Sequence, residues 1–384
     1  MMNPHPKSFT LDSQLSILNS QFSIRNFSLY IHIPFCLRLC PFCHFYRIPD
    51  IPDWRVYLEG IRKELDLPGF EDAGSVRTMY VGGGTPTVFP VVFFRELFQV
   101  LAERFDLSPL DESTIETDGD VTVEELGPLR DTGFDRISIG VKSFLPRTRE
   151  LLGIEPWSGK DPVSAARKAG FPSVSVDLVY GIEGQTLDEL VLDLKHVAVT
   201  DPDHVSLYSL EEGDGSEWDP DLASAMFRES LRALTVFGYQ QYEITNFARA
   251  SHPSRHNAAY WQDADYIGIG PSAHSSLTRN GVRTRWRNRP DVFQYLKNPS
   301  GCREILSREE GADRAREALI LGLRMREGVH RAPFYRRYGH DPVVLFGTHL
   351  RELKEAGLVR LSAGRIRLTT RGMLLSNEVF VRLI

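Results

Sequence analysis

Three of the four cysteines of the chain lie within eight residues, in the spacing Cys36-x-x-x-Cys40-x-x-Cys43. Thiolates are soft ligands, and three of them on one tight loop can each bind one iron of a [4Fe–4S] cluster. The fourth iron then has no protein ligand and can bind a small chelating molecule. Three protein ligands beside an open position are typical of catalytic metal sites. The spacing therefore predicts a cluster with one exchangeable corner.

Other chemistry fits the same residues. Cys36, Cys40 and Cys43 together with His44 have the composition of a structural zinc site. Cys40 to His44 also match C-x-x-C-H, the attachment pattern of c-type haem, which requires export of the chain. Three buried cysteines without a metal are a further interpretation, because cysteine also serves as a small apolar residue. Cys302 is far away in the sequence and has no predicted role.

The composition is that of an ordinary globular chain, with 384 residues, 42% of them hydrophobic, and a net charge of −6. This charge argues against a generic polyanion binder, and four cysteines are too few for the disulfide framework of a small secreted module. The sequence contains no run of about 18 apolar residues, so it predicts no membrane span. The first 20 residues are polar and lack the apolar centre of a signal peptide. We therefore expect a protein of the reducing cytoplasm.

Strand and helix patterns alternate through most of the chain. The β-rich runs cover residues 28–33, 75–81, 113–117, 136–140, 173–180 and 204–210, with a further candidate at 242–245. Helical periodicity covers residues 54–67, 91–105, 122–129, 162–169, 186–199 and 221–237. Such alternation favours an α/β fold with a parallel sheet, and this number of units favours a partial (β/α) barrel. The chemistry of such barrels lies at the C-terminal ends of the strands.

The unusual residues follow that rule. The cysteine loop comes after the first strand, three consecutive glycines from Gly82 to Gly84 end the second, and Glu116 ends the third. Glycine has no Cβ, so a ligand can approach the backbone closely there. Asp177 lies in an otherwise apolar strand, where a carboxylate needs a partner. We expect these residues to meet at one end of the sheet.

The last part of the chain has a different character. Residues 308–384 carry a net charge of +6, with helical patterns at 313–324, 333–338 and 342–355 and a hairpin pattern around 362–364. Three helices and a hairpin predict a winged-helix-like domain. We expect it to pack on the barrel or to bind a protein, and not nucleic acid, since charge alone is a weak indicator. The predicted organisation is a leader at 1–27, a barrel at 28–300 and this domain at 301–384.

Several motifs in order resemble one family. They are YIHIPFC at 30–36, GGGTPT at 82–87, Glu116 after a strand, RISIGV at 136–141, DLVYG at 177–181 and YEITNFA at 242–248. Over residues 28–384 the chain is similar to the radical S-adenosylmethionine (SAM) enzymes, in the branch of the oxygen-independent coproporphyrinogen oxidases and their relatives. The resemblance implies a radical-SAM-type partial barrel that binds a [4Fe–4S] cluster and SAM and receives an electron from a donor protein.

The resemblance also implies roles for single residues. The cluster ligands are Cys36, Cys40 and Cys43. The SAM-associated positions are Tyr30, Gly83, Gly84, Thr85, Glu116 and Asp177. In the family, the glycine-rich strand end contacts the amino-acid part of SAM, and Tyr30 packs near the cluster.

Two features indicate the branch. The oxidases usually carry a further cysteine two positions after the third, where this chain has Phe45. Haem chaperones of the HemW type carry H-N-x-x-Y-W, which matches His256 to Trp261. The resemblance therefore implies a haem chaperone that delivers haem to acceptor proteins, with His256 as a candidate haem ligand or attachment point. The alternatives are a coproporphyrinogen III oxidase and a zinc- or DNA-associated binding module on an inactive barrel.

The chain departs from the family at two SAM-site positions. Lys142 replaces the usual glutamine, and Ile154 replaces the usual arginine. A charged lysine donates hydrogen bonds but cannot accept them, and isoleucine does neither. His44 also stands where the family has an acidic residue. Whether SAM is cleaved is therefore open at the level of the sequence.

Overall fold

The computed structural model describes residues 26–67, 70, 74–156, 158–210 and 219–384. The predicted leader lies outside the described residues, except for Asn26 and Phe27, which begin the first strand. No helix in the described part of the chain is long and apolar enough to cross a membrane.

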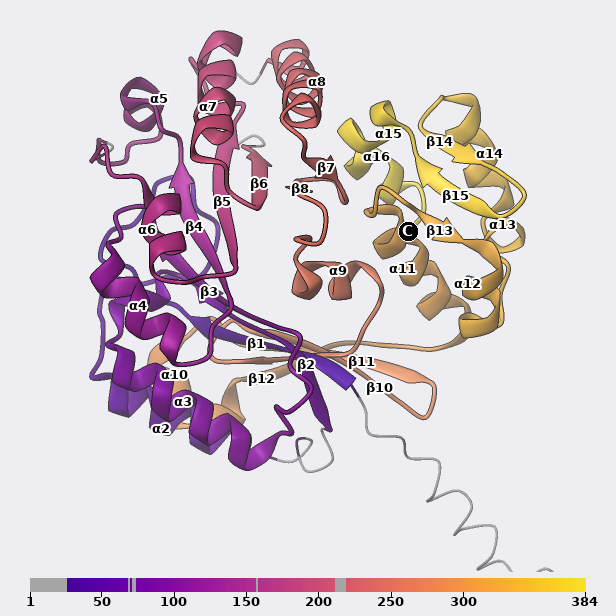
Figure 1. The fold of residues 1–384 in the computed structure, drawn as a ribbon. Coiled ribbons are helices and arrows are strands. Elements are labelled where there is room, and N and C mark those ends of the chain that lie inside the picture. The colour runs from indigo at the N-terminus through magenta and orange to yellow at the C-terminus, as the bar shows by residue number, and fades with distance from the viewer. Residues whose placement is uncertain (1–25, 68–69, 71–73, 157, 211–218) are drawn as a thin grey trace, which may run out of the picture.

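A parallel sheet forms the centre of the molecule, which confirms the predicted α/β partial barrel (Figure 1). Its six parallel strands are β1 (Asn26–Ile33), β2 (Ser75–Gly83), β3 (Glu112–Asp118), β4 (Arg136–Lys142), β5 (Ser173–Tyr180) and β6 (His204–Ser209), side by side in sequence order. The helices between them are α2 (Trp54–Leu65), α3 (Val91–Arg104), α4 (Val123–Asp131), α5 (Pro146–Leu151), α6 (Pro162–Lys168), α7 (Leu187–Thr200) and α8 (Pro220–Val236). A short 3-10 turn, η1 (Pro86–Val88), follows β2.

Further strands, most of them antiparallel, extend the sheet at both edges. β8 (Asn246–Ala248) and β7 (Gln240–Gln241) follow β6, whereas β9 (Tyr266–Ile269) runs parallel to β1 and leads to β10 (His274–Arg279), β11 (Val282–Asn288) and β12 (Arg303–Glu309). The remaining helices here are α9 (Arg255–Trp261), α10 (Val292–Lys297) and η2 (Pro299–Cys302). β12 carries the sheet past residue 300, where we expected the C-terminal domain to begin.

The predicted strand at 242–245 is wrong, because these residues form the turn between β7 and β8. Glu243 explains the turn: its carboxylate accepts hydrogen bonds from the backbone N–H and the hydroxyl of Thr245, at 2.9 and 2.8 Å. Such local side-chain bonds compete with strand pairing.

The two faces of the sheet differ in chemistry. Ile31, Val81, Ile115, Ile137 and Val176 alternate along the strands and are fully buried in the apolar core, together with residues of the flanking helices. The opposite face carries polar side chains at the intervening positions: Ser28, Tyr30, Thr78, Tyr80, Thr114, Glu116, Arg136, Ser138, Ser175, Asp177, His204 and Ser206. Barrel interiors are usually filled by branched apolar residues. A polar interior face therefore indicates that this side of the sheet binds a ligand.

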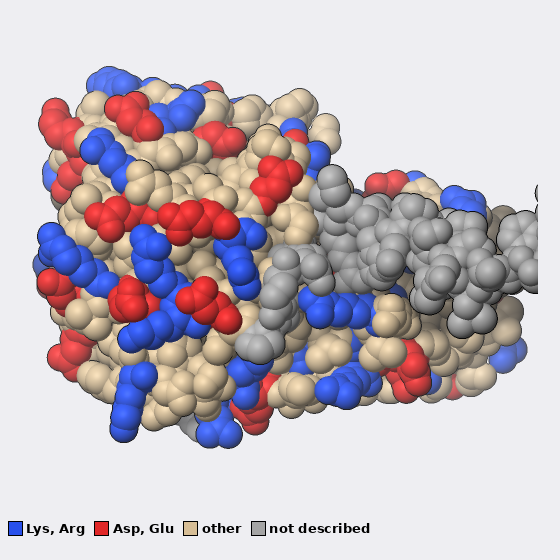
Figure 2. All heavy atoms as spheres, turned by 90° about the horizontal axis from the view of Figure 1, so that it is seen from below, with Lys and Arg blue, Asp and Glu red and all other residues tan. Residues whose placement is uncertain are grey.

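The C-terminal part contains a small sheet in the order β13-β15-β14. Its elements are α11 (Gly311–Leu323), β13 (Val329–His330), α12 (Arg331–Tyr338), α13 (Pro342–Leu345), α14 (Gly347–Glu355), β14 (Val359–Leu361), β15 (Arg365–Leu368), α15 (Thr370–Leu374) and α16 (Ser376–Val381). The predicted helix at 342–355 is divided at Phe346, which is buried. Four helices, α11 to α14, precede the hairpin of β14 and β15, which matches the predicted winged-helix-like pattern except that the third predicted helix is two helices. Seen from below, the molecule shows basic and acidic side chains interleaved on the face of α2 and α3 (Figure 2).

Candidate functional site

The cysteine loop is held at both of its ends. The backbone N–H of Cys36 donates to the carbonyl of Ile48 at 3.2 Å, and the N–H of Ile48 donates to the carbonyl of Pro34 at 2.8 Å. Within the loop, the Arg47 guanidinium donates to the carbonyl oxygens of Cys40 and Cys43. These bonds fix the backbone around the thiols without using the sulfur atoms.

All three thiols are free, and Cys36 is the most buried of them. Burial raises the pKa of Cys36 and of Cys40, and the three cysteines lie near enough to influence one another electrostatically. Cations oppose this effect: Arg47 lowers the pKa of both thiols, and Lys142 and Arg149 lower that of Cys40.

A set of free thiols surrounded by cations fits an anionic iron–sulfur cluster. Among the described residues, no three His, Cys, Asp or Glu side chains converge on the position of a single metal ion. In a cluster, by contrast, each cysteine binds its own iron.

The glycine-rich end of β2 lies directly against the cysteine loop. A Cβ on Gly84 would lie 2.5 Å from the carbonyl oxygen of Phe35 and 3.0 Å from Cys36 Sγ, so only glycine fits. Gly83 has a φ of +112°, and a Cβ there would lie 2.5 Å from the ring of His32. The Thr85 hydroxyl donates to Cys36 Sγ at 3.7 Å. The triple glycine therefore lets the strand end approach the predicted cluster ligands.

Glu116 lies at the end of β3, beside this strand end. Its Oε1 accepts a hydrogen bond from the Tyr80 hydroxyl at 2.7 Å, and its Oε2 accepts one from the backbone N–H of Gly83 at 2.9 Å. Burial raises the pKa of Glu116, the Asp177 charge adds to the increase, and Lys142 opposes it. Asp177 itself accepts a hydrogen bond from the Ser138 hydroxyl at 3.1 Å, which supplies the partner that its strand required. Each carboxylate oxygen has a further lone pair for a ligand donor.

Tyr30 connects the first strand to the cysteine loop through His32. The Nε2–H of His32 donates to the carbonyl of Tyr46 at 3.1 Å, so Nδ1 accepts a hydrogen bond from the Tyr30 hydroxyl at 2.8 Å. Burial lowers the pKa of His32 to about 4, and the ring is therefore neutral. Tyr30 is thus linked, through His32, to the segment that follows the three cysteines.

His256 lies farther along the polar face, on the short helix α9. Its Nδ1 bonds to the Thr78 hydroxyl at 2.9 Å, and that hydroxyl donates onward to Ser28 at 2.8 Å. Nδ1 must therefore carry the proton, and Nε2 accepts a hydrogen bond from the Tyr260 hydroxyl at 2.9 Å. The ring is 1% exposed, and burial lowers its pKa to about 3. Both nitrogens are occupied, so an iron could reach Nε2 only after Tyr260 moves.

Tyr80, which no sequence motif indicated, links the two parts of the site. Its hydroxyl binds Glu116, and its ring lies 5.2 Å from that of His256. Arg136 is a second such residue: it is 3% exposed on the polar face, and its Nε has no hydrogen-bond partner among the described residues. The hydroxyl of Thr114, its neighbour in the strand register, also lacks one. The alternation of polar and apolar residues in these strands indicates that such residues share a face, but not that this face points inward.

The two family departures both lie near residues of the cysteine loop. Lys142 has a φ of +67° and folds back over Gly140, near Glu116 and Cys40. Ile154 instead joins a small apolar cluster that contains Leu152, Val179 and Phe42 of the cysteine loop.

Comparison with known proteins agrees with this arrangement. Residues 30–197 match the model of the radical SAM superfamily, and residues 310–375 match that of the HemN C-terminal domain. The haem chaperone HemW of Lactococcus lactis is 31% identical over 377 residues, which cover 93% of this chain and 97% of that protein. The HemW of Bacillus subtilis is also 31% identical and covers 92% and 98%. Among solved structures, coproporphyrinogen III oxidase (HemN) from Escherichia coli matches 98% of this chain and 93% of its own, with a TM-score of 0.77 and 24% identity, which shows a shared fold.

Proposed function

Since the chain belongs to the radical SAM superfamily and, within it, to the family of the HemW proteins, we propose that it is a haem chaperone that binds a [4Fe–4S] cluster, SAM and haem. It would hold haem for transfer to an acceptor protein. The relatives that match nearly the whole chain are named haem chaperones, which supports this role.

The observation that carries the proposal is the meeting of three elements at one end of the sheet. Cys36, Cys40 and Cys43 would hold the cluster, and their loop packs on Gly84 at the end of β2. Glu116 lies beside the same strand end and accepts the N–H of Gly83.

The polar face continues from these elements into the interior of the barrel. Glu116 and Asp177 offer acceptors for the amino and hydroxyl groups of SAM, and Thr85 donates to a cluster ligand. When bound, the cluster and SAM supply one-electron chemistry, while the protein binds, orients and excludes water.

The haem part of the proposal depends on α9. This helix carries the H-N-x-x-Y-W residues, and Tyr80 connects it to the SAM side of the site. The predicted role of His256 as an iron ligand requires release of the Tyr260 hydroxyl from Nε2. In its present position, His256 holds Tyr260 in place.

Anaerobic reconstitution tests the proposal. We expect the purified protein to bind about four irons and four sulfides, to bind ferric haem with a Soret band, and to bind SAM. Cys40→Ser should lose the cluster. Cys302→Ser is the matched control, since Cys302 is buried away from the loop and donates only to the carbonyl of Asn298.

Two results would contradict the proposal. One is stoichiometric zinc in place of iron and sulfide after anaerobic purification. The other is turnover of coproporphyrinogen with SAM and a reductant, which would identify an oxidase. Phe45, 66% exposed where the oxidases carry a further cysteine, argues against that second result.

A further inference from the structure

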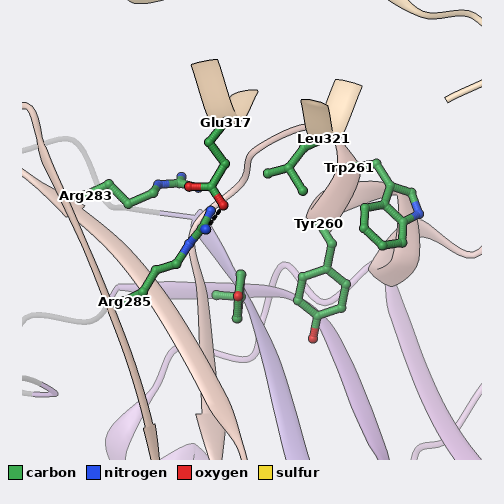
Figure 3. Close-up of a pocket in the computed structure, with 7 residues that line it drawn as sticks. Tyr260, Trp261, Arg283, Arg285, Glu317 and Leu321 are labelled. Carbon is green, nitrogen blue, oxygen red and sulfur yellow. Dashed lines mark ion pairs between the residues drawn. The ribbon is translucent and has the colours of Figure 1, made fainter. Parts of the chain in front are cut away.

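A pocket lies where three separate parts of the chain meet (Figure 3). Tyr260 and Trp261 come from the end of α9, Arg283 and Arg285 from β11, and Glu317 from α11 of the C-terminal part. Its volume is about 250 Å³, which is below the ~300–1,000 Å³ of sites that enclose a whole small molecule. The pocket can therefore take one edge of a larger ligand.

The aromatic side of the pocket is formed by the motif that defines the family branch. Tyr260 contacts Tyr266 edge to face, with ring centroids 4.6 Å apart, and its hydroxyl is held by His256. Arg324 lies over the Trp261 ring at 4.2 Å and supports it. Leu321 completes an apolar wall that suits the edge of a flat ring.

The two arginines differ in how many of their hydrogen-bond donors are already in use. Arg283 is 1% exposed and is fully engaged by Asp263, Asp265 and Thr278. Arg285 contacts Glu317 and Glu309 through Nη1 alone, and its buried Nε has no hydrogen-bond partner among the described residues. A guanidinium presents five donors in a fork that matches a carboxylate in two-point geometry. Arg285 therefore keeps a donor that is not used among the described residues, whereas Arg283 does not.

We propose that the pocket binds the carboxylate-bearing edge of a tetrapyrrole, with a propionate on Arg285 and the ring edge against Tyr260, Trp261 and Leu321. This inference rests on the proposed function, because haem supplies both the flat apolar ring and the propionates. Glu317 occupies Arg285 in the free protein and has to be displaced. Glu317 belongs to α11 and Arg285 to the large sheet. Binding of the ligand therefore replaces a contact between these two parts of the chain with a contact between Arg285 and the ligand.

The test compares ferric haem with its dimethyl ester, in which both propionates are masked. We expect the wild-type protein to prefer haem roughly ten- to hundredfold, as a charge-assisted hydrogen-bonded pair implies. Arg285→Gln should remove this preference. Glu317→Gln should bind haem several-fold more tightly, because the competing carboxylate is gone. Arg287→Gln is the matched control: it lies on the same strand and pairs with Glu304, outside the pocket.

The opposite signs make the test specific. Arg285→Gln and Glu317→Gln break the same ion pair, so a purely structural role would weaken haem binding in both variants. That result, or a preference for haem that survives in Arg285→Gln, overturns the inference while leaving the chaperone proposal intact. Equal binding of haem and ester by the wild-type protein does the same. Failure of the wild-type protein to bind either compound overturns both.

Discussion

Glu112 is the residue on which we expect the position of α9 to depend most. It begins β3 and is 6% exposed. Its Oε1 accepts hydrogen bonds from the hydroxyl of Ser254 at 3.2 Å and from the backbone N–H of His256 at 3.0 Å. Its Oε2 accepts the N–H of Arg255 at 2.8 Å. One carboxylate thus accepts the first two N–H groups of a seven-residue helix, from a strand that is 142 to 144 residues away in sequence. A short helix of this kind has little stability of its own.

The expected cost follows from these bonds. Glu112→Ala leaves two N–H groups without their acceptor, at about 1–3 kcal/mol each, so we expect a loss of about 2–6 kcal/mol in the free energy of unfolding. Glu112→Gln keeps one acceptor oxygen and should lose about half as much. Burial lowers the pKa of the nearby Arg136, and the Glu112 carboxylate raises it. Removal of this carboxylate therefore leaves the buried charge of Arg136 with less electrostatic stabilisation.

Urea unfolding gives the free energy, and hydrogen exchange of the peptide that spans 254–261 gives the local effect. We expect the amides of Arg255 and His256 to exchange at least tenfold faster in Glu112→Ala. Glu103→Ala is the matched control, because Glu103 is 69% exposed and makes one ion pair, with Arg62 at 3.4 Å, which is worth at most about 1 kcal/mol. If Glu112→Ala behaves like this control, the reasoning about α9 is refuted.

Three further expectations concern other parts of the site. Gly84→Ala should lower the free energy of unfolding by about 1–3 kcal/mol and disturb cluster assembly, because the new Cβ would clash with the Phe35 carbonyl. Gly347→Ala, where a Cβ has open space, should do neither. Thermal unfolding measures the stability of both variants, and iron content measures cluster assembly. Glu116→Gln should keep the Tyr80 bond but weaken SAM binding in calorimetry, and unchanged affinity would exclude Glu116 from the SAM site. Burial holds the folded pKa of His256 at about 3, below its ordinary 6.5, so its folded state favours the neutral ring and loses stability as the pH falls from 6.5. The stability advantage of the wild type over His256→Gln should therefore shrink as the pH falls below 6.5, with a slope that approaches about 1.4 kcal/mol per pH unit towards pH 5. An advantage that grows in acid would contradict this assignment.

The sequence was sufficient for the parallel sheet because each β-rich run is short and ends at a residue that stops it, such as Gly82 or Pro34. It was also sufficient to place the cysteine loop and the glycine-rich strand end together, since both follow neighbouring parallel strands. It failed at 242–245, where the side chain of Glu243 forms a turn that β propensity does not reveal. It also placed the end of the large sheet before β12, whose partner is known only once the topology is known.

The polar partners across the sheet could not be predicted. His256 bonds to Thr78 over 178 residues of sequence, and no local pattern indicates that pair. Tyr80 was assigned to a strand as an ordinary residue, and Arg136 had no role beyond the RISIGV motif, because the sequence does not tell which face of a strand points inward. Only the burial of the alternating apolar residues against the helices identifies that face.

The structure also gives a physical meaning to the departures at Lys142 and Ile154. Ile154, which stands where the family has an arginine, lies in an apolar cluster. The Lys142 side chain, however, places a positive charge near Glu116 and Cys40. The methionine part of SAM carries a carboxylate that needs a cation near the cluster. We therefore expect Lys142→Gln to weaken SAM binding about tenfold or more, although glutamine is the usual residue of the family, because a charged hydrogen bond is replaced by a neutral one. Adding Ile154→Arg to that variant should recover much of the affinity. Titration calorimetry of the reconstituted protein decides the matter: if Lys142→Gln binds SAM as well as the wild type does, Lys142 does not replace the missing arginine.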